Sequence, residues 1–389
     1  MGFRKFRPNQ LFNGYTFLNE EQVLITKPDG TVEGLVSMDE AGDDIEKLDG
    51  ILTPGLINCH CHLELSHLKN VIPPHTGLVE FLCSVVTKRG FAAELVQQEI
   101  EKAEQEMYEN GIAAAGDICN TADAVRIKSG SNMRWQNFIE VLSFTDAKAI
   151  ENMAHYETVL HAHKAVLFAP NRNVLTPHAP YSISPKTFEL LNAATANQII
   201  SIHNQEHPAE DELYKTGGGD YLKLFKIFGV ESSPFPVTGK SSLQSYLPYF
   251  KNGQTIFLIH NTYMPQEDIA FANDYAKENG LTLVYCLCPN ANLYIENKLP
   301  EAEKFIDSGC HIVLGTDSYS SNWQLSIAKE IQTIHQHFPA LALETILQWA
   351  TSNGAKALQW DNELGSFEKG KRPGVTLLAN DLGSSVRVL

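Results

Sequence analysis

The chain has 389 residues, of which 43% are hydrophobic and 20% are charged, a composition typical of a globular protein. Its net charge of −16 disfavours a nucleic-acid partner, because phosphate binding requires a basic surface, and no apolar run approaches membrane-spanning length. The seven cysteines, an odd number in apolar contexts, indicate reduced thiols and predict a cytoplasmic location rather than a disulfide framework.

The first 50 residues form short alternating runs separated by turns, which is typical of β-structure. The segment VLITKPDGTVEGLV predicts a hairpin that turns at Asp29-Gly30. The segment LGSFEKGKRPGVTLLAN near the C-terminus has the same character. Because both ends of the chain read as strands, we expect residues 1–50 and 359–389 to form one small β-sandwich domain together.

Residues 51–358 show a different pattern, in which short apolar strands alternate with helices such as 92–110 and 344–358. The eight expected strands are ILTPGLINCH, GIAAAGDIC, FIEVLSF, NVLTPHAP, QIISIHNQE, TIFLIHN, LTLVYCLCP and HIVLGTDS. This alternation predicts an α/β fold, a (β/α)8 TIM barrel, as the catalytic domain.

Polar residues suited to chemistry lie at the C-terminal ends of these strands or just beyond them. They are His60, His62, His178, His203, Glu206, His260 and Asp317. Active sites of such barrels are built at this rim from several strands, so we expect these side chains to meet.

The stretch INCHCHLELSH contains the densest group of metal-binding side chains. Side chains alternate faces along a strand, so His60 and His62 point one way while Cys59 and Cys61 point the other. Two imidazoles at this spacing can chelate one ion, although two ordinary histidines at a strand end would give the same pattern. The paired loops of a zinc finger are missing.

His203 and Asp317 complete the expected metal site. Either residue alone could be an ordinary buried side chain. Together with His60 and His62 they give three imidazoles and one carboxylate, placed on the first, fifth and eighth strands of one barrel. Such a set suits one divalent ion, with zinc favoured and iron as the alternative, and it leaves room for water.

The motifs LTPGLINCHCHLELS, TPHAPYSIS, SIHNQE, FLIHN, CPNANLYI and LGTDSYSSN, in this order, resemble the amidohydrolase superfamily. Within it they are similar to the cytosolic deaminase branch that includes chlorotriazine hydrolases, guanine deaminase and adenosylhomocysteine-type deaminases. The resemblance implies one metal on His60, His62, His203 and Asp317. It also implies that Glu206 is the proton shuttle, that His260 is the partner of the attacking water, and that His178 contacts the substrate.

The chemistry of these residues agrees with the implied roles. Asp317 can accept a proton from water, and Glu206 can deliver one to a ring nitrogen, which makes the adjacent carbon electrophilic. His260 could steady the attacking oxygen. Without the other site residues, the sequence would indicate that Glu206 is an exposed acidic residue in a loop and that His178 makes a hydrogen bond that orders its loop.

The fourth expected strand, NVLTPHAPYSIS, has no lysine. Members of this superfamily with two metals usually bridge them with a modified lysine there. A single-metal site is therefore favoured, and with it the deamination of an aromatic ring.

The substrate is less well defined than the reaction. Where nucleoside deaminases of this branch hold an acidic residue for the ribose, this chain has Lys88-Arg89. Arg89 would suit a substrate carboxylate, although a solvated helix end is an equal reading. The form HLELS followed by a Lys/Pro-rich loop resembles aminodeoxyfutalosine deaminases, so we expect an aminated purine nucleoside, with 6-amino-6-deoxyfutalosine or an adenosine- or adenosylhomocysteine-like compound as the specific candidates.

Other functions compete with this one. They are deamination of a free base of the guanine or cytosine type, chloro- or amide hydrolysis on the same scaffold, and a non-catalytic barrel stabilised by metal. We expect a small-molecule substrate and consider a homodimer as the assembly.

Overall fold

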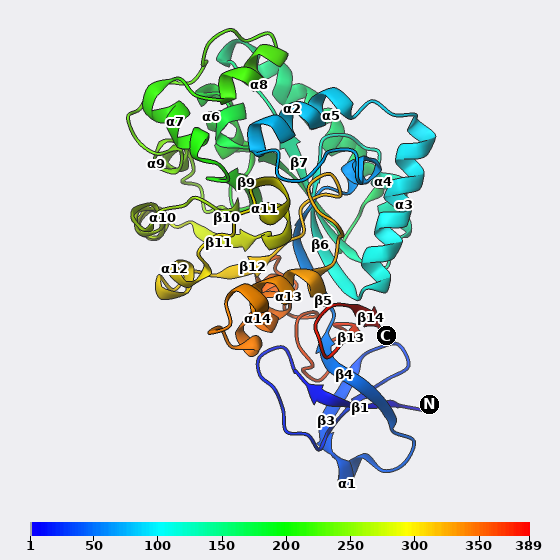
Figure 1. Ribbon diagram of the computed structural model, residues 1–389. Coiled ribbons are helices and arrows are strands. Elements are labelled where there is room, and N and C mark those ends of the chain that lie inside the picture. Colours follow the sequence, from blue (N-terminus) through cyan, green and yellow to red (C-terminus); the bar gives the residue numbers. More distant parts are fainter. Residues whose placement is uncertain (1) are drawn as a thin grey trace.

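The computed structural model describes residues 2–389 and contains three β-sheets surrounded by helices (Figure 1). The strands are β1 Arg4–Leu11, β2 Gln22–Thr26, β3 Val32–Ser37, β4 Glu46–Pro54, β5 Leu56–Cys61, β6 Ile112–Cys119, β7 Arg134–Val141, β8 Arg172–Pro177, β9 Ile199–Asn204, β10 Thr255–His260, β11 Thr282–Leu287, β12 Ile312–Leu314, β13 Val375–Leu378 and β14 Ser385–Arg387. Each of the eight strands expected between residues 51 and 318 has a counterpart here.

The helices connect and cover these strands. They are α1 Met38–Ala41, α2 Leu78–Lys88, α3 Ala93–Glu109, α4 Val125–Gly130, α5 Ala149–Val166, α6 Pro185–Ala194, α7 Pro208–Thr216, α8 Tyr221–Ile227, α9 Ser242–Tyr246, α10 Gln266–Asn279, α11 Pro289–Glu296, α12 Ala302–Asp307, α13 Ile327–His337, α14 Leu343–Trp349 and α15 Ser352–Ala357. Short 3-10 helices cover Leu63–Leu68, Asp146–Lys148, Pro180–Ser182 and Leu247–Tyr249. No helix among residues 2–389 has both the length and the apolarity needed to cross a membrane.

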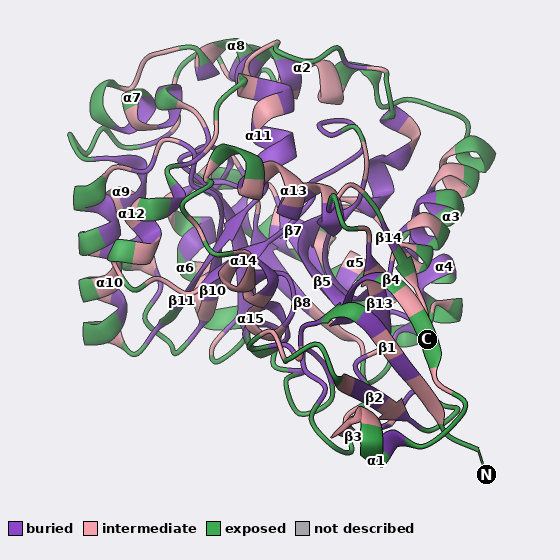
Figure 2. Ribbon diagram, turned by 60° about the horizontal axis from the view of Figure 1, so that its bottom comes forward, coloured by how far each residue is buried: buried purple, intermediate pink, exposed green. Residues whose placement is uncertain are grey.

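Two four-stranded parallel sheets form the centre of the mixed α/β fold, one with the order β5-β6-β7-β8 and the other with the order β12-β11-β10-β9. Their strands are largely buried because helices cover them, and Figure 2 shows the strands in purple inside a shell of partly exposed helices. The backbone N–H of His203 donates to His178 O at 2.9 Å, so the two sheets adjoin at β8 and β9. At the other edge, Thr316 N donates to His60 O at 2.9 Å.

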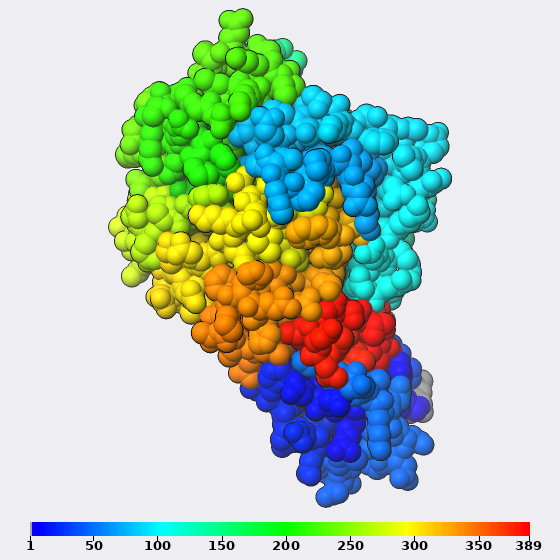
Figure 3. Space-filling model, viewed as in Figure 1, coloured from blue at the N-terminus to red at the C-terminus, as the bar shows by residue number. Residues whose placement is uncertain are grey.

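The third sheet, here called the terminal sheet, contains six strands in the order β14-β13-β4-β1-β2-β3. It combines strands from both ends of the chain, and in Figure 3 the red C-terminal residues lie against the blue N-terminal segment. The expected hairpin is present, because β2 and β3 pair antiparallel and Gly30 adopts a φ of +87° in the turn. Strand β4 leads directly into β5, so the terminal sheet supports the start of the strand that carries His60.

The single helix expected over 344–358 is instead two helices, α14 and α15. The break lies at Thr351, whose φ of −134° and ψ of −92° are not helical. Its hydroxyl donates to Leu347 O at 2.6 Å, a local bond that competes with continuation of the helix.

Candidate active site

Strand β5 positions the first two histidines. All six of its residues are buried, and His60 is completely inaccessible to solvent. Cys61 points to the other side of the strand, where its thiol donates to the buried Asp117 carboxylate at 3.3 Å. The alternation expected from the sequence is therefore present, and burial raises the pKa of the Cys61 thiol well above its usual value.

Asp317 reaches the same point from the loop that follows β12. Its backbone N–H donates to His60 O at 3.0 Å, and its φ of +57° is a conformation that aspartate tolerates better than most residues. Ser321 Oγ donates to Asp317 Oδ2 at 2.6 Å. This leaves Oδ1 facing the histidines, 3.3 Å from His60 Nε2 and 3.2 Å from His62 Nε2.

His203 and His260 lie on the paired strands β9 and β10, with their rings stacked 5.5 Å apart. The Nδ1 of His203 is bound to His178 O at 2.8 Å, so its Nε2 is the nitrogen left for a ligand. His260 adopts an unusual φ of +71°. The amide Nδ2 of Asn292 donates to His260 Nδ1 at 3.3 Å, which places the proton of the neutral ring on Nε2.

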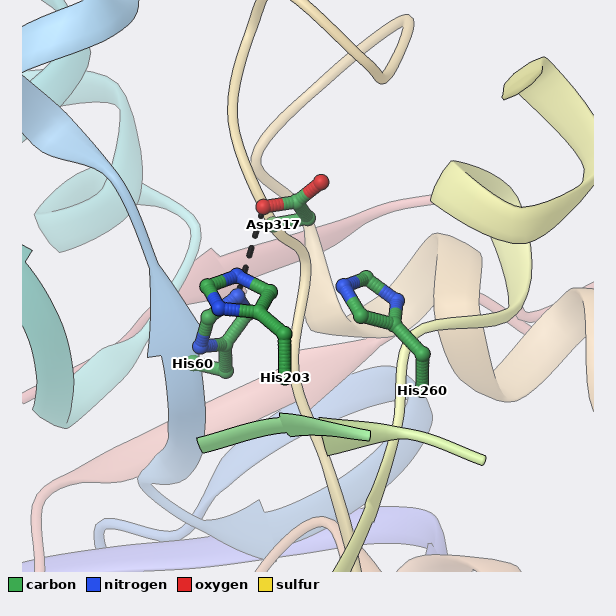
Figure 4. A group of neighbouring side chains, drawn as sticks. All are labelled: His60, His203, His260 and Asp317. Atoms are coloured by element: carbon green, nitrogen blue, oxygen red, sulfur yellow. Dashed lines mark ion pairs between the residues drawn. The ribbon is translucent and has the colours of Figure 1, made fainter. Parts of the chain in front are cut away.

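Four side chains form a compact group suited to a metal ion. His60, His203, His260 and Asp317 each offer an atom within 4.8 Å of the others (Figure 4). Both ring nitrogens of His60 are buried and make no hydrogen bond, an arrangement that would be costly without a cation. His62, which we expected as a ligand, lies beside this group, with its ring 5.4 Å from that of His203.

Electrostatics keep these groups in the protonation states that a metal requires. Burial lowers the pKa of His60 and of His203, and it lowers that of His260 to about 3, so the imidazoles are neutral. Burial opposes ionisation of Asp317, but the close contacts of its Oδ1 with His60 and His62 hold the pKa of the carboxyl well below its usual value. Neutral imidazoles with one carboxylate fit zinc or a similar divalent ion.

Glu206 is the acidic group next to this cluster. It follows β9, is 4% exposed, and lies with Oε1 3.6 Å from His260 Nε2. Burial raises the pKa of Glu206 well above its usual value, and the nearby carboxylates of Asp317 and Glu210 raise it further. The raised pKa favours the protonated form of the carboxyl, which is the form that a proton donor needs.

A cavity of about 410 Å³ opens in front of these residues. Its polar floor includes His62, Glu140, His178, His203, Glu206, His260 and Asp317. Its wall is mostly apolar and consists of Leu78, Phe81, Leu82, Val85 and Val86 from α2 together with Leu142, Phe144, Leu224 and Phe228. A flat apolar ring with polar edges would match this lining.

The remaining expected residues differ in their positions. His178 lines the cavity and is oriented by Ser182, whose Oγ lies 2.7 Å from Nδ1. Arg89, just past the end of α2, lies at the cavity, whereas its neighbour Lys88 is exposed and outside the lining.

Sequence reasoning missed three residues of this site: Glu140, Asn292 and Ser321. Glu140 is the third residue of the expected strand FIEVLSF, so the rule that selected residues at strand ends passed over it; the structure ends β7 at Val141 and so places Glu140 near the C-terminal end. Asn292 and Ser321 act on other side chains rather than on the cavity, and no spacing in the sequence marks that role.

The family model described as amidohydrolase family matches residues 51–385. An adenosine deaminase of Helicobacter pylori is 26% identical over 83% of this chain and 78% of its own length. An aminodeoxyfutalosine deaminase of Nitratiruptor sp. is 24% identical over 96% of this chain and 91% of its own. The crystal structure of Helicobacter pylori aminofutalosine deaminase with methylthio-coformycin superimposes with a TM-score of 0.81 at 21% identity, covering 99% of this chain and 97% of that one.

Proposed function

Because the chain belongs to the amidohydrolase family, we propose that it is a metal-dependent hydrolytic deaminase that releases ammonia from an aminated purine nucleoside. The observation that carries this proposal is a buried Glu206, with a raised pKa, beside His260 and the histidine–aspartate group, all facing one cavity. An acid next to a metal site in a cavity is what hydrolytic removal of an amino group from a ring requires. The relatives named as deaminases of adenosine and of aminodeoxyfutalosine support the same reaction.

We propose His60, His62, His203 and Asp317 as the ligands of one divalent metal, with zinc favoured by the donor set and iron as the alternative. His62 supports this choice over His260, because its Nε2 faces Asp317 Oδ1 at 3.2 Å, whereas the Nε2 of His260 faces Glu206. Such a metal, when bound by these residues, would lower the pKa of water towards ~7 and would so supply a nucleophile at neutral pH.

The residues of the chain then perform the proton transfers. Asp317 accepts the proton of the attacking water. Glu206 delivers its proton to the ring nitrogen beside the amino-bearing carbon, which makes that carbon electrophilic. His260 donates from Nε2 to the attacking oxygen on the tetrahedral carbon, and the proton held by Asp317 passes to the amino group, which leaves as ammonia.

His178 and Arg89 are proposed as substrate contacts. His178 lies on the cavity floor, and Arg89 lies at the cavity with the apolar side chains of α2. A nucleoside that carries a carboxylate on an apolar substituent, such as 6-amino-6-deoxyfutalosine, would place its charge near Arg89. Adenosine and adenosylhomocysteine-like substrates would use the same floor without that contact.

The decisive experiment incubates the zinc-loaded protein with adenosine, adenosylhomocysteine, 6-amino-6-deoxyfutalosine, guanine, cytosine and a chlorotriazine. Absorbance and released ammonia are followed in each reaction. We expect ammonia from at least one nucleoside. Ammonia from the free bases alone, chloride from the triazine alone, or no product at all would contradict the proposal.

We also propose a closed (β/α)8 barrel over residues 51–358, with a β-sandwich domain from residues 1–50 and 359–389. Backbone bonds at both edges of the two parallel sheets support closure. A cytoplasmic location is supported by seven free cysteines. The homodimer stays a prediction that light scattering would test.

A further inference from the structure

Glu140 is a buried carboxylate on the cavity floor that the reaction above does not use. It is the second-last residue of β7, is 3% exposed, and lines the cavity. Its Oε2 accepts a hydrogen bond from Asn120 Nδ2 at 2.8 Å, whereas its buried Oε1 has no partner. A buried carboxylate oxygen without a donor is costly, so a group that enters the cavity is the natural donor.

The neighbouring side chains of the chain do not supply that donor. The nearest are His203 Nδ1 at 3.7 Å and His178 Nε2 at 4.0 Å. His203 Nδ1 is already bound to His178 O, and His178 Nε2 at 4.0 Å is too far away for a hydrogen bond. The free oxygen of Glu140 is therefore left for a ligand.

The two carboxyl groups of the floor lie at different places. Glu206 lies beside His260, 3.6 Å from its Nε2, and Glu140 lies beside His178 on the neighbouring parallel sheet. In a purine nucleoside, the ring nitrogen that needs a proton lies beside the amino group, and the sugar hydroxyls lie at the other end. We propose that Glu140 binds the sugar of the substrate by accepting hydrogen bonds from its hydroxyl groups, an inference that rests on the proposed nucleoside deamination.

A free base offers the same hydrogen-bonding chemistry through an N–H group at that end. Adenosine, 2′,3′-dideoxyadenosine and adenine separate the two sources, since only adenosine has the vicinal hydroxyls and only adenine has the free N–H. The variant Glu140→Gln keeps the size of the side chain and removes its charge.

We expect Glu140→Gln to raise the KM for adenosine by about 10- to 100-fold, which is the usual effect of losing a hydrogen bond to a charged group, with a smaller change in kcat. The KM for dideoxyadenosine should stay within about two-fold of the wild-type value. An equal loss with both nucleosides would show that Glu140 only orients its histidine neighbours or binds water. A loss confined to adenine would assign the donor to the N–H group. Either result would overturn the proposal.

Two further variants test whether the effect depends on the orientation of Glu140 and whether it is specific to this carboxyl. Asn120→Ala removes the donor that fixes Oε2 and should produce the same selectivity in a weaker form, even if Glu140→Gln does not fold. Glu104→Gln changes another buried carboxyl, bonded to Ser131 Oγ and outside the cavity, and should leave the ratio of the two KM values unchanged. Zinc content is measured in every variant, and only variants with full zinc are compared.

Calorimetry separates this proposal from the deaminase proposal. If the wild-type protein deaminates nothing, the binding of adenosine and dideoxyadenosine still tests Glu140. If the wild-type protein binds adenosine more tightly than dideoxyadenosine, and Glu140→Gln removes this difference, the contact with the sugar is supported even in a protein that is not a deaminase. Equal binding of the two compounds to the wild-type protein, or no binding of adenosine, would overturn it.

Discussion

Replacing Lys128 with methionine should destabilise the protein strongly, because it would leave a buried charge without its partner. Lys128 Nζ and the Asp117 carboxylate form an ion pair in which both side chains are completely buried. Lys128 also donates to Asn137 Oδ1 at 2.6 Å and to Cys119 Sγ at 3.2 Å. Burial opposes its charge, but Asp117 holds the pKa of Lys128 above its usual value, so the lysine keeps its charge.

Removal of one member of such a pair costs about 3–5 kcal/mol, whereas replacement of both by uncharged groups costs far less. We therefore expect Lys128→Met and Asp117→Asn each to lose about 3–5 kcal/mol, and the double variant to lose about 2 kcal/mol or less. The exposed pair Lys186–Glu189 is the matched control, and Lys186→Met should change stability by about 0.5 kcal/mol at most.

The same variants should weaken metal binding. Asp117 Oδ1 accepts the backbone N–H of Leu63 at 2.7 Å, one residue after His62, so the ion pair fixes the segment that carries this histidine. Urea unfolding gives the stability differences, and competition with a chelator gives the zinc affinity. A loss below about 1 kcal/mol for Lys128→Met, or a double variant as unstable as the sum of the two singles, would refute this account of the pair.

Three further predictions concern the site and its surroundings. Glu206→Gln should lower kcat by about 10²- to 10⁴-fold with little change in zinc content, because only the proton donor is lost; kinetics and metal analysis measure both. His60→Ala and Asp317→Ala should each lose most of the bound zinc, measured by elemental analysis after dialysis. Glu210→Gln should reduce the loss of thermal stability at alkaline pH, because burial raises the pKa of Glu210 to about 8. The protonated carboxyl contributes its full stabilising free energy below a pH of about 4.5, and this contribution is lost as the pH rises through about 8.

Each of these has a result that contradicts it. Full activity in Glu206→Gln would exclude that carboxyl as the proton donor. Unchanged zinc in both His60→Ala and Asp317→Ala would move the metal elsewhere. Melting temperatures of Glu210→Gln that follow the wild-type pH profile would show that Glu210 does not titrate in the folded protein.

The sequence predicts the strands of the two parallel sheets well, because short apolar runs that alternate with helical segments are typical of buried parallel strands. It also places His60, His203 and Asp317 at one rim, since the ends of parallel strands meet. It also places His260 at that rim, but it does not predict that His260, in place of His62, joins the compact group, because the positions of the rings depend on tertiary contacts. The break at Thr351 is equally local, because the non-helical backbone of one residue divides a helix whose apolar pattern is continuous.

Figure 1 shows that the terminal sheet places β13 beside β4, and this order has a consequence for synthesis of the protein. Residues Ile51–Pro54 of β4 pair with Val375–Leu378, more than 300 positions later in the chain. The ribosome must therefore release nearly the whole chain before that edge of β4 is covered. Until then β4 exposes unpaired backbone groups next to apolar side chains, which is a surface on which nascent chains aggregate. The yield of folded protein should consequently depend on how quickly the last strands are completed, rather than on the barrel strands alone.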